Sequence, residues 1–225
     1  MTIARSLVIF DVEGTLVDST ALTMRCWQET LQSFGLEFPL ATLQRHSGQD
    51  GHDMLHALIP GPHVSRVVPR ILEAQGERFH AKYLPRVAAF PEIRALFERV
   101  KHAGQMIAVA TSSSADELDH YLALTNAGDL VDAVACGEDV EHDKPNSALI
   151  EVALLRTGCL APKHAAMIGD TPYDAMAARR AGVAAIGMLS GGFSRQDLES
   201  RGCIAVYRDP ADLLARFGET ARLRA

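Results

Sequence analysis

The sequence predicts an α/β protein with a doubly wound, mostly parallel sheet and an inserted helical cap domain. From Pro91 onward, short apolar segments alternate with helical patterns, as in a parallel sheet covered by helices on both faces. Between an apolar opening segment at Leu7–Phe10 and Pro91, the patterns are helical only. We assign the opening segment to the same sheet as the later strands. The predicted domains are therefore a core of residues 1–18 and 87–225 and a helical cap of residues 19–86.

The individual elements follow from the apolar periodicity and from proline and glycine between them. Three helices are expected in the cap, at Ala21–Phe34, Gly51–Leu58 and Ser65–Tyr83. The strands that follow in the core are expected at Met106–Ala110, Ala133–Cys136, Ala165–Ile168, Ala184–Met188 and Ile204–Tyr207. The core helices are expected at Glu92–Ala103, Ala115–Leu124, Ser147–Arg156, Pro172–Ala181 and from Pro210.

The composition is that of a globular protein. Of the 225 residues, 48% are hydrophobic, which is ample for a packed core. The 28 acidic and 22 basic residues give a net charge of −6, with no block of Lys or Arg that would follow a nucleic-acid backbone. The four cysteines are far apart and predict neither a disulfide framework nor a zinc site.

The first six residues are too short for the apolar core of a secretion signal, and no apolar run is long enough to cross a bilayer. We therefore expect a cytoplasmic protein that binds neither nucleic acid nor membrane. A monomer and a homodimer are both compatible with the sequence.

Two carboxylates follow the opening strand directly. Asp11 and Glu13 are one residue apart, and Gly14 lets the backbone turn away sharply. In open α/β sheets, ligands bind beyond the carboxyl ends of the strands, so both acids are expected in a crevice. Two such acids can share a metal ion and divide the roles of nucleophile and proton-transfer group.

Two later strands also end in polar residues. Thr111 and Ser112 follow the strand at Met106–Ala110, where hydroxyls and free amides before a helix form a good anion cradle. Serine and threonine at such a place are also ordinary helix N-caps. Asp170 follows the strand at Ala165–Ile168 and is expected at the same sheet edge as Asp11; a third acid there suits Mg²⁺.

The surroundings of Asp170 also have a purely structural interpretation. Thr171, Pro172 and Asp174 have the spacing of a helix start with a capping box, which does not account for Asp170 itself. Lys144 follows a segment with four acids, and a lysine there could simply belong to a solvated loop. In a site with several carboxylates, however, a protonated lysine would neutralise the nucleophile and a bound phosphoryl group.

A zinc site is a competing possibility in the cap. His52 and His56 are four residues apart on a predicted helix, as in a His-Glu-x-x-His motif. Asp53 between them is shorter than the glutamate that such a motif uses as its base, and no third ligand is evident. A surface or interhelical histidine pair is the preferred interpretation.

Taken together, the strand-end segments resemble the haloacid dehalogenase-like hydrolase superfamily, in its phosphoglycolate phosphatase and β-phosphoglucomutase-like branch with a helical cap. The resemblance covers nearly the whole chain. The matching motifs, in order, are Asp11–Leu16, Thr111, Lys144-Pro145 and Gly169-Asp170 with Asp174. They imply a Rossmann-like core and an Mg²⁺-dependent phosphatase that hydrolyses a small phosphorylated metabolite through an aspartyl-phosphate.

The resemblance also implies a role for each matching residue. Asp11 would attack phosphorus, and Glu13 would protonate the leaving alcohol and then deprotonate the attacking water. The phosphate-binding residues would be Asp11, Gly14, Thr111, Ser112 and Lys144. The metal ligands would be Asp11, Glu13 through its carbonyl, and Asp170, with Asp174 in support through water or by orienting Lys144.

One residue departs from the family pattern, and alternatives remain open. The usual acid/base residue of the family is Asp, whereas Glu13 is one methylene longer. A sugar-phosphate mutase is the nearest alternative, although many mutases carry a histidine near the position of Thr23. A catalytically silent, ligand-sensing protein is the third possibility. The substrate itself is not predictable, and the candidate substrate residues of the cap are Gln44, Arg45, His46 and Gln49, with Arg66 and Arg70 as further polar candidates.

Overall fold

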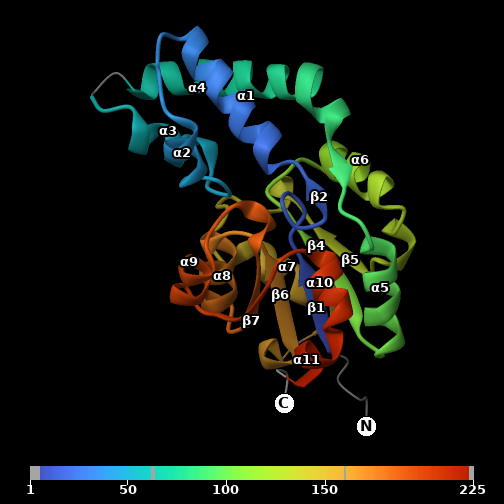
Figure 1. The fold of residues 1–225 in the computed structure, drawn as a ribbon. Helices are drawn as coiled ribbons and strands as arrows, with labels where there is room; N and C mark the ends of the chain where they lie inside the picture. Colours follow the sequence, from blue (N-terminus) through green and yellow to red (C-terminus); the bar gives the residue numbers. More distant parts are fainter. Residues whose placement is uncertain (1–5, 62–63, 160, 223–225) are drawn as a thin grey trace. The chain divides into compact units, whose positions relative to one another are not determined.

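The structure, a computed structural model, describes residues 6–61, 64–159 and 161–222 (Figure 1). The chain divides into two compact units: unit 1 comprises Met1–Asp18 and Ala89–Ala225, and unit 2 comprises Ser19–Ala88. The expectation about a secretion signal rests on the first six residues, of which 1–5 lie outside the described range. None of the described helices combines the length and the apolar character needed to span a bilayer.

Unit 1 is built on a six-stranded sheet in the order β5-β4-β1-β6-β7-β8, and its described strand pairs are all parallel. The predicted α/β class with a mostly parallel sheet is therefore confirmed. Because the chain continues from β1 to β4 on one side and from β6 to β7 on the other, the strand order reverses between β1 and β6. Ligands of open α/β sheets bind at such a reversal. The strands are β1 (Leu7–Phe10), β4 (Met106–Ala110), β5 (Ala133–Ala135), β6 (Ala165–Gly169), β7 (Ala184–Met188) and β8 (Cys203–Tyr207).

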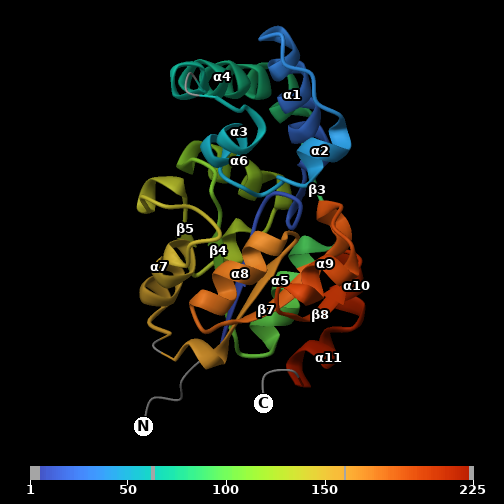
Figure 2. The same ribbon diagram turned by 90° about the vertical axis from the view of Figure 1, so that its left-hand side faces the viewer.

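Helices cover both faces of this sheet (Figures 1 and 2). On one face, Leu7 and Ile9 pack in one apolar cluster with residues of α7 and α8. On the other face, Phe10 packs against Phe97 of α5, with ring centroids 4.8 Å apart. The strands can therefore be apolar on both sides, which explains their continuous hydrophobic runs. The helices of unit 1 are α5 (Ile93–His102), α6 (Ala115–Thr125), α7 (Ala148–Thr157), α8 (Pro172–Arg180), α9 (Arg195–Ser200), α10 (Pro210–Ala215) and α11 (Phe217–Arg222).

Unit 2 is helical, with an apolar core of its own. Met24, Trp27 and Leu31 of its first helix share this core with Leu55 and Ile71, and all five are buried. Burial of such side chains contributes about 1.5–3 kcal/mol each to the stability of the unit. The helices are α1 (Thr20–Ser33), α2 (Leu40–Gln44), α3 (Gly51–Leu58) and α4 (Val64–Arg78), followed by a π-helical turn at Phe79–Tyr83 and a 3-10 turn at Leu84–Arg86.

Several short elements differ from the sequence prediction. The predicted helix 65–83 is α-helical only as far as Arg78 and continues as the π-helical turn. The five-residue α2 and the six-residue α9 were not predicted, because they are too short for a helical period to show. The same holds for two strands of two residues each, β2 (Val17–Asp18) and β3 (Ala88–Ala89), which pair with each other where the chain leaves and re-enters the core.

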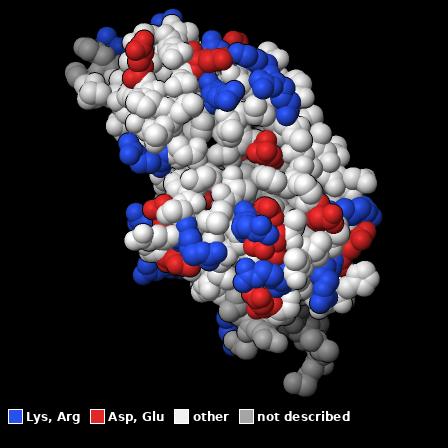
Figure 3. Space-filling model, viewed as in Figure 1, with Lys and Arg blue, Asp and Glu red and all other residues white. Residues whose placement is uncertain are grey.

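Charged side chains of both signs are interspersed on the face shown in Figure 3. Many charges of unit 1 are paired, for example Lys101 with Asp132 at 2.7 Å and Arg94 with Asp129 at 2.8 Å. Exposed pairs of this kind contribute little, at most about 1 kcal/mol each. The four cysteines are buried as free thiols.

Two glycines of unit 2 allow a matched test of backbone effects. A Cβ at either Gly76 or Gly35 would meet no atom within 4 Å, but Gly35 has a φ of 74° whereas Gly76 lies inside α4. We expect Gly76→Ala to raise the free energy of unfolding by about 0.5–1 kcal/mol, because alanine restricts the unfolded chain and favours the helix. Gly35→Ala should lower it by about 1 kcal/mol through left-handed backbone strain. Urea unfolding of both variants measures the difference; shifts of the same sign would contradict this account.

Candidate active site

A tight turn after β1 positions the first acids. The amide of Asp11 donates to the carbonyl of Ile168 at 2.9 Å and extends the pairing of β1 with β6 by one residue. The amides of Leu16 and Val17 then donate back to the carbonyl of Val12, at 2.7 and 3.0 Å. The turn requires a φ of 75° at Gly14, a conformation that glycine adopts at no steric cost. Asp11 is therefore held, buried, at the point where the strand order reverses.

Three carboxylates and one ammonium group meet there. Asp11, Asp170 and Asp174 are buried and bring carboxylate oxygens within 4.8 Å of one another. Lys144, only 4% exposed, forms ion pairs with Asp11 and with Asp174, the latter at 2.8 Å. The hydroxyl of Thr15 donates to Asp170 at 3.3 Å. Residues from three separate segments of the sequence are thus brought together by the sheet and its loops.

Asp174 belongs both to the N-terminal cap of α8 and to the ion pair with Lys144. Its Oδ2 accepts hydrogen bonds from the amide and the hydroxyl of Thr171, at 3.0 and 2.7 Å, and completes the predicted capping box of α8. Its Oδ1 faces Lys144. A Cβ at Gly169 would lie 2.4 Å from Cγ of Asp174, so no larger residue fits at that position. The helix cap therefore fixes the carboxylate that binds the lysine.

Glu13 is held by hydroxyls from the loop after β4. Its Oε2 accepts a hydrogen bond from Oγ of Ser113 at 2.8 Å and a longer one from Oγ1 of Thr111 at 3.3 Å. Thr111 in turn accepts from the amide of Ser113 at 3.0 Å. The side chain of Ser112 is exposed. Ser113 was not predicted from the sequence, where it is one of three consecutive serines.

Burial dominates the electrostatics of this constellation. It raises the pKa of Asp11 to about 7, although Lys144 opposes the rise, and it raises the pKa of Asp170 well above its ordinary value, with the carboxylates of Asp11 and Asp174 adding to the effect. Burial also raises the pKa of Glu13. Burial acts to lower the pKa of Lys144, but the carboxylates of Asp11 and Asp174 outweigh it and raise that pKa well above the usual value.

The donor set fits a hard divalent cation. Within the described residues, the cluster offers three buried carboxylates against one ammonium group. Carboxylate oxygens are the ligands that Mg²⁺ and Ca²⁺ prefer, and Mg²⁺ is usually bound by one or two protein carboxylates together with substrate phosphates. A cation of this kind would balance the excess negative charge.

The loop after β7 completes the wall around Asp170. This loop was not predicted from the sequence to be part of the site. The hydroxyl of Ser190 donates to the carbonyl of Gly14 at 2.6 Å. A Cβ at Gly191 would lie 2.1 Å from Oδ2 of Asp170, so this position also requires glycine. The sequence did hold a signal: Ser190 and two glycines begin two residues after the end of a predicted strand, at the sheet edge where the other site residues emerge.

The candidate substrate residues of the cap all lie in unit 2. Gln44 ends α2, and the other three, Arg45, His46 and Gln49, follow it in one segment. Nδ1 of His46 and Oε1 of Gln49 are 2.8 Å apart, which orders this segment locally.

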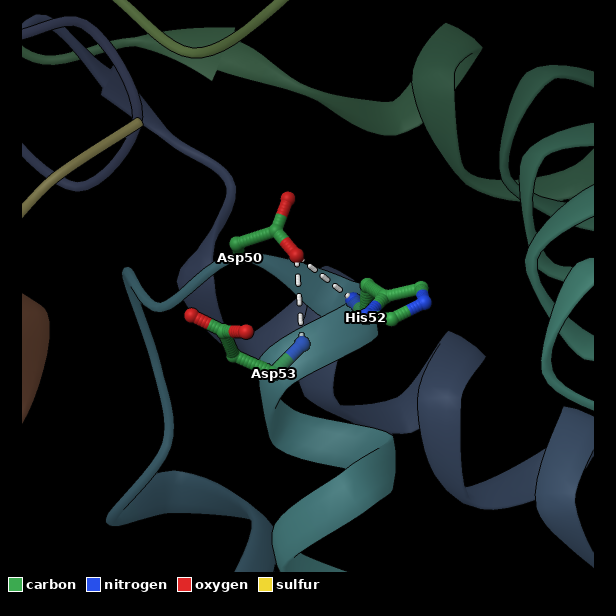
Figure 4. A group of neighbouring side chains, drawn as sticks. All are labelled: Asp50, His52 and Asp53. Carbon is green, nitrogen blue, oxygen red and sulfur yellow. Dashed lines mark hydrogen bonds between the residues drawn. The ribbon is translucent and has the colours of Figure 1, made fainter. Parts of the chain in front are cut away.

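The histidine pair of the cap has a structural explanation. Oδ1 of Asp50 accepts hydrogen bonds from the amides of His52 and Asp53, at 2.8 and 3.1 Å, and thereby caps α3 (Figure 4). The rings of His52 and His56 are 4.5 Å apart. Asp50, His52 and Asp53 could reach a common cation, but all three are exposed and one oxygen of Asp50 already serves the cap. The arrangement favours a surface histidine pair, as preferred from the sequence.

Comparison with known proteins gives the family. The family model described as "Haloacid dehalogenase-like hydrolase" matches residues 8–188. A phosphoglycolate phosphatase of Rhodospirillum rubrum is 29% identical over 215 residues, covering 92% of this chain and 88% of its own, and the pyrophosphatase PpaX of Bacillus velezensis is 27% identical over 182 residues, covering 80% and 82%. The crystal structure of a hydrolase from Pseudomonas syringae is similar with a TM-score of 0.81 and 28% identity, over 96% of this chain and 99% of that one. The chain belongs to the haloacid dehalogenase-like hydrolases.

Proposed function

We propose that the protein is an Mg²⁺-dependent phosphatase that hydrolyses a small phosphorylated metabolite through an aspartyl-phosphate on Asp11. The observation that carries the proposal is the buried ion pair of Asp11 with Lys144, beside Asp170 and Asp174 at the reversal of strand order. A purely structural role needs no such cluster, because burying unbalanced carboxylates costs stability. The names of the phosphoglycolate phosphatase and the pyrophosphatase support phosphorylated small molecules as the substrate class.

In the first step, a carboxylate oxygen of Asp11 attacks phosphorus, and the bond from phosphorus to the leaving oxygen breaks. Glu13 donates its proton to that oxygen. In the second step, Glu13 accepts a proton from water, whose oxygen attacks the phosphoryl group and releases phosphate and the free Asp11 carboxylate. Two displacements thus share one proton-transfer residue.

The remaining residues position the phosphoryl group. The Lys144 ammonium, the Thr111 hydroxyl and the backbone amides near Gly14 and Ser112 would hold its oxygens, since phosphoryl transfer depends mainly on positioning and charge stabilisation. Asp174 orients Lys144 through their ion pair.

Asp11, Asp170 and the carbonyl of Glu13 would hold the Mg²⁺. The ion supplies positive charge that offsets the carboxylates and the phosphoryl oxygens. The cap would select the substrate through its polar segment after α2 and exclude water, as lids do.

Phosphate release from p-nitrophenyl phosphate and from a panel of phosphorylated metabolites tests the proposal. We expect turnover that requires Mg²⁺ and stops with EDTA. Absence of phosphate release from every compound in the presence of Mg²⁺ would refute it. Conversion of a sugar 1-phosphate to the 6-phosphate in the presence of the bisphosphate, without release of phosphate, would indicate a mutase instead.

Removal of the Glu13 carboxylate should separate the two steps. With p-nitrophenyl phosphate, whose leaving group needs no proton, Glu13→Ala should still become phosphorylated, whereas hydrolysis of the phosphoenzyme should slow by about 10²–10⁴-fold. Intact-protein mass spectrometry after an acid quench measures the phosphorylated fraction. Glu13→Asp is the control, because it retains an acid and should turn over without accumulating phosphoenzyme. No phosphoenzyme in either variant would count against this role of Glu13.

A further inference from the structure

We propose that Ser113 is a positioning residue that holds the Glu13 carboxylate for proton transfer, an inference that rests on the proposed phosphatase function. Its hydroxyl donates to Oε2 of Glu13 at 2.8 Å, the shorter of the two hydrogen bonds to that oxygen. Ser113 is 7% exposed, so few water molecules compete for its hydroxyl. A hydrogen bond to a carboxylate in such a place is one of the stronger kinds.

Thr111 cannot hold Glu13 by itself during the reaction. A hydroxyl has a single hydrogen, and the proposed mechanism assigns that of Thr111 to a phosphoryl oxygen. The bond from Thr111 to Glu13 is also long, at 3.3 Å. Once the phosphoryl group binds, Ser113 is the donor that remains on Oε2. Because Ser113 keeps its hydrogen bond to Oε2, Oε1 is the oxygen that delivers the proton to the leaving group.

Ser113 binds both Glu13 and Thr111, each through a different atom. Its hydroxyl binds Glu13, while its amide donates to Oγ1 of Thr111 at 3.0 Å. The loop is fixed in turn, because the carbonyl of Ser113 accepts from the amide of Gly137 at 2.9 Å and a Cβ at Gly137 would lie 2.6 Å from the carbonyl oxygen of Ser112. The hydroxyl of Ser113 therefore lies at a fixed distance from the end of β1, which Glu13 follows.

This distance suits a glutamate rather than the aspartate usual in the family. Shortening Glu13 by one methylene would draw its carboxylate back by up to about 1.5 Å, the length of one carbon–carbon bond. The 2.8 Å hydrogen bond would then exceed hydrogen-bonding distance, and the fixed loop could not follow. Glu13 and Ser113 thus form a matched pair.

The dependence on the leaving group tests this pairing. We expect Ser113→Ala to slow single-turnover phosphorylation of Asp11 by phenyl phosphate about 10–10²-fold, because phenolate leaves poorly without a proton. With p-nitrophenyl phosphate the same variant should stay within about threefold of the wild type, because that leaving group needs little proton transfer. Ser113→Thr retains a hydroxyl and should restore most of the rate with phenyl phosphate.

A neighbouring serine provides the structural control. Oγ of Ser114 accepts from the amide of Glu117 and caps α6. Ser114→Ala should lower the melting temperature through loss of the cap, without changing the ratio of the rates with the two aryl phosphates. A loss of stability alone therefore does not imitate the effect expected of Ser113→Ala.

The Glu13→Asp background completes the test. There, addition of Ser113→Ala should change phosphorylation by phenyl phosphate less than twofold, because the shortened acid no longer reaches the serine. Equal slowing with both aryl phosphates, or an undiminished effect in the Glu13→Asp background, would overturn the inference while leaving the phosphatase proposal intact. A wild-type protein with no turnover that depends on Asp11 would overturn both.

Discussion

Asp11→Asn is expected to reduce phosphatase turnover by about 10⁴-fold or more, because the amide is nearly the same shape as the carboxylate but is no nucleophile towards phosphorus. Phosphate release from p-nitrophenyl phosphate with Mg²⁺ measures the loss. Wild-type turnover in the variant would exclude Asp11 as the attacking group.

The same substitution should stabilise the metal-free protein at neutral and alkaline pH. Burial raises the pKa of Asp11 from 3.8 to about 7, and a group whose pKa is raised on folding favours the folded state below its unfolded pKa and loses that contribution as the pH rises through its folded pKa. Wild-type protein in EDTA should therefore lose stability from this group between about pH 4 and pH 7, whereas Asp11→Asn should not. The advantage of the variant should reach about 2–4 kcal/mol above pH 7.

Urea unfolding in EDTA from pH 4 to pH 8 measures this difference. Addition of Mg²⁺ should then reduce the stability advantage of the variant, because Mg²⁺ binds the folded wild-type protein more strongly than the variant. If Asp11→Asn were less stable than the wild type at pH 8 in EDTA, the stability gained from the ion pair of Asp11 with Lys144 would exceed the cost of burying the charged Asp11.

The positions of the site acids were predictable because of one physical rule. Parallel strands end at one edge of a sheet, so Asp11 and Asp170, each directly after an apolar run, must emerge near each other. Thr171 and Asp174 were predictable as a capping box from their spacing alone, and the cap is present. The capping box is a local rule, whereas the meeting of Asp11 and Asp170 needs only the fold class in addition.

Other features depend on distances that no local pattern encodes. The approach of Gly191 to Asp170 and the hydrogen bond from Ser113 to Glu13 both join residues from different strand ends. The sequence shows only that small and hydroxyl-bearing residues stand there. Which of the three serines at 112–114 points towards the acids is decided by the path of the loop, which the amide of Gly137 fixes through its hydrogen bond to Ser113.

The second large effect is expected for Lys144→Met, which removes the ammonium group while keeping a side chain of similar length. Turnover should fall by about 10³-fold, since a charge that stabilises the phosphoryl group is lost. Metal-free protein should also lose about 3–5 kcal/mol of stability at pH 8, because Asp11, Asp170 and Asp174 remain buried without their cation.

The pH dependence distinguishes this cause from a simple packing defect. Without Lys144, the three carboxylates repel one another, and their protonation relieves the repulsion. Burial already raises the pKa values of Asp11 and Asp170 in the folded wild type, and loss of the Lys144 ammonium, which opposes the rise, raises both further. The stability deficit should therefore shrink as the pH falls from 8 towards 5. A packing defect would give a deficit that does not change with pH.

A matched surface lysine controls for the loss of charge as such. Lys101 pairs with Asp132 at 2.7 Å, with both side chains 34% exposed, so Lys101→Met should cost about 1 kcal/mol or less and leave turnover unchanged. In the double variant Asp11→Asn/Lys144→Met, one unpaired carboxylate has gone, and part of the lost stability should return. If Lys144→Met were as stable as the wild type in EDTA at pH 8, the carboxylates would have to be protonated already, and the cluster would not carry the negative charge that makes it a cation site.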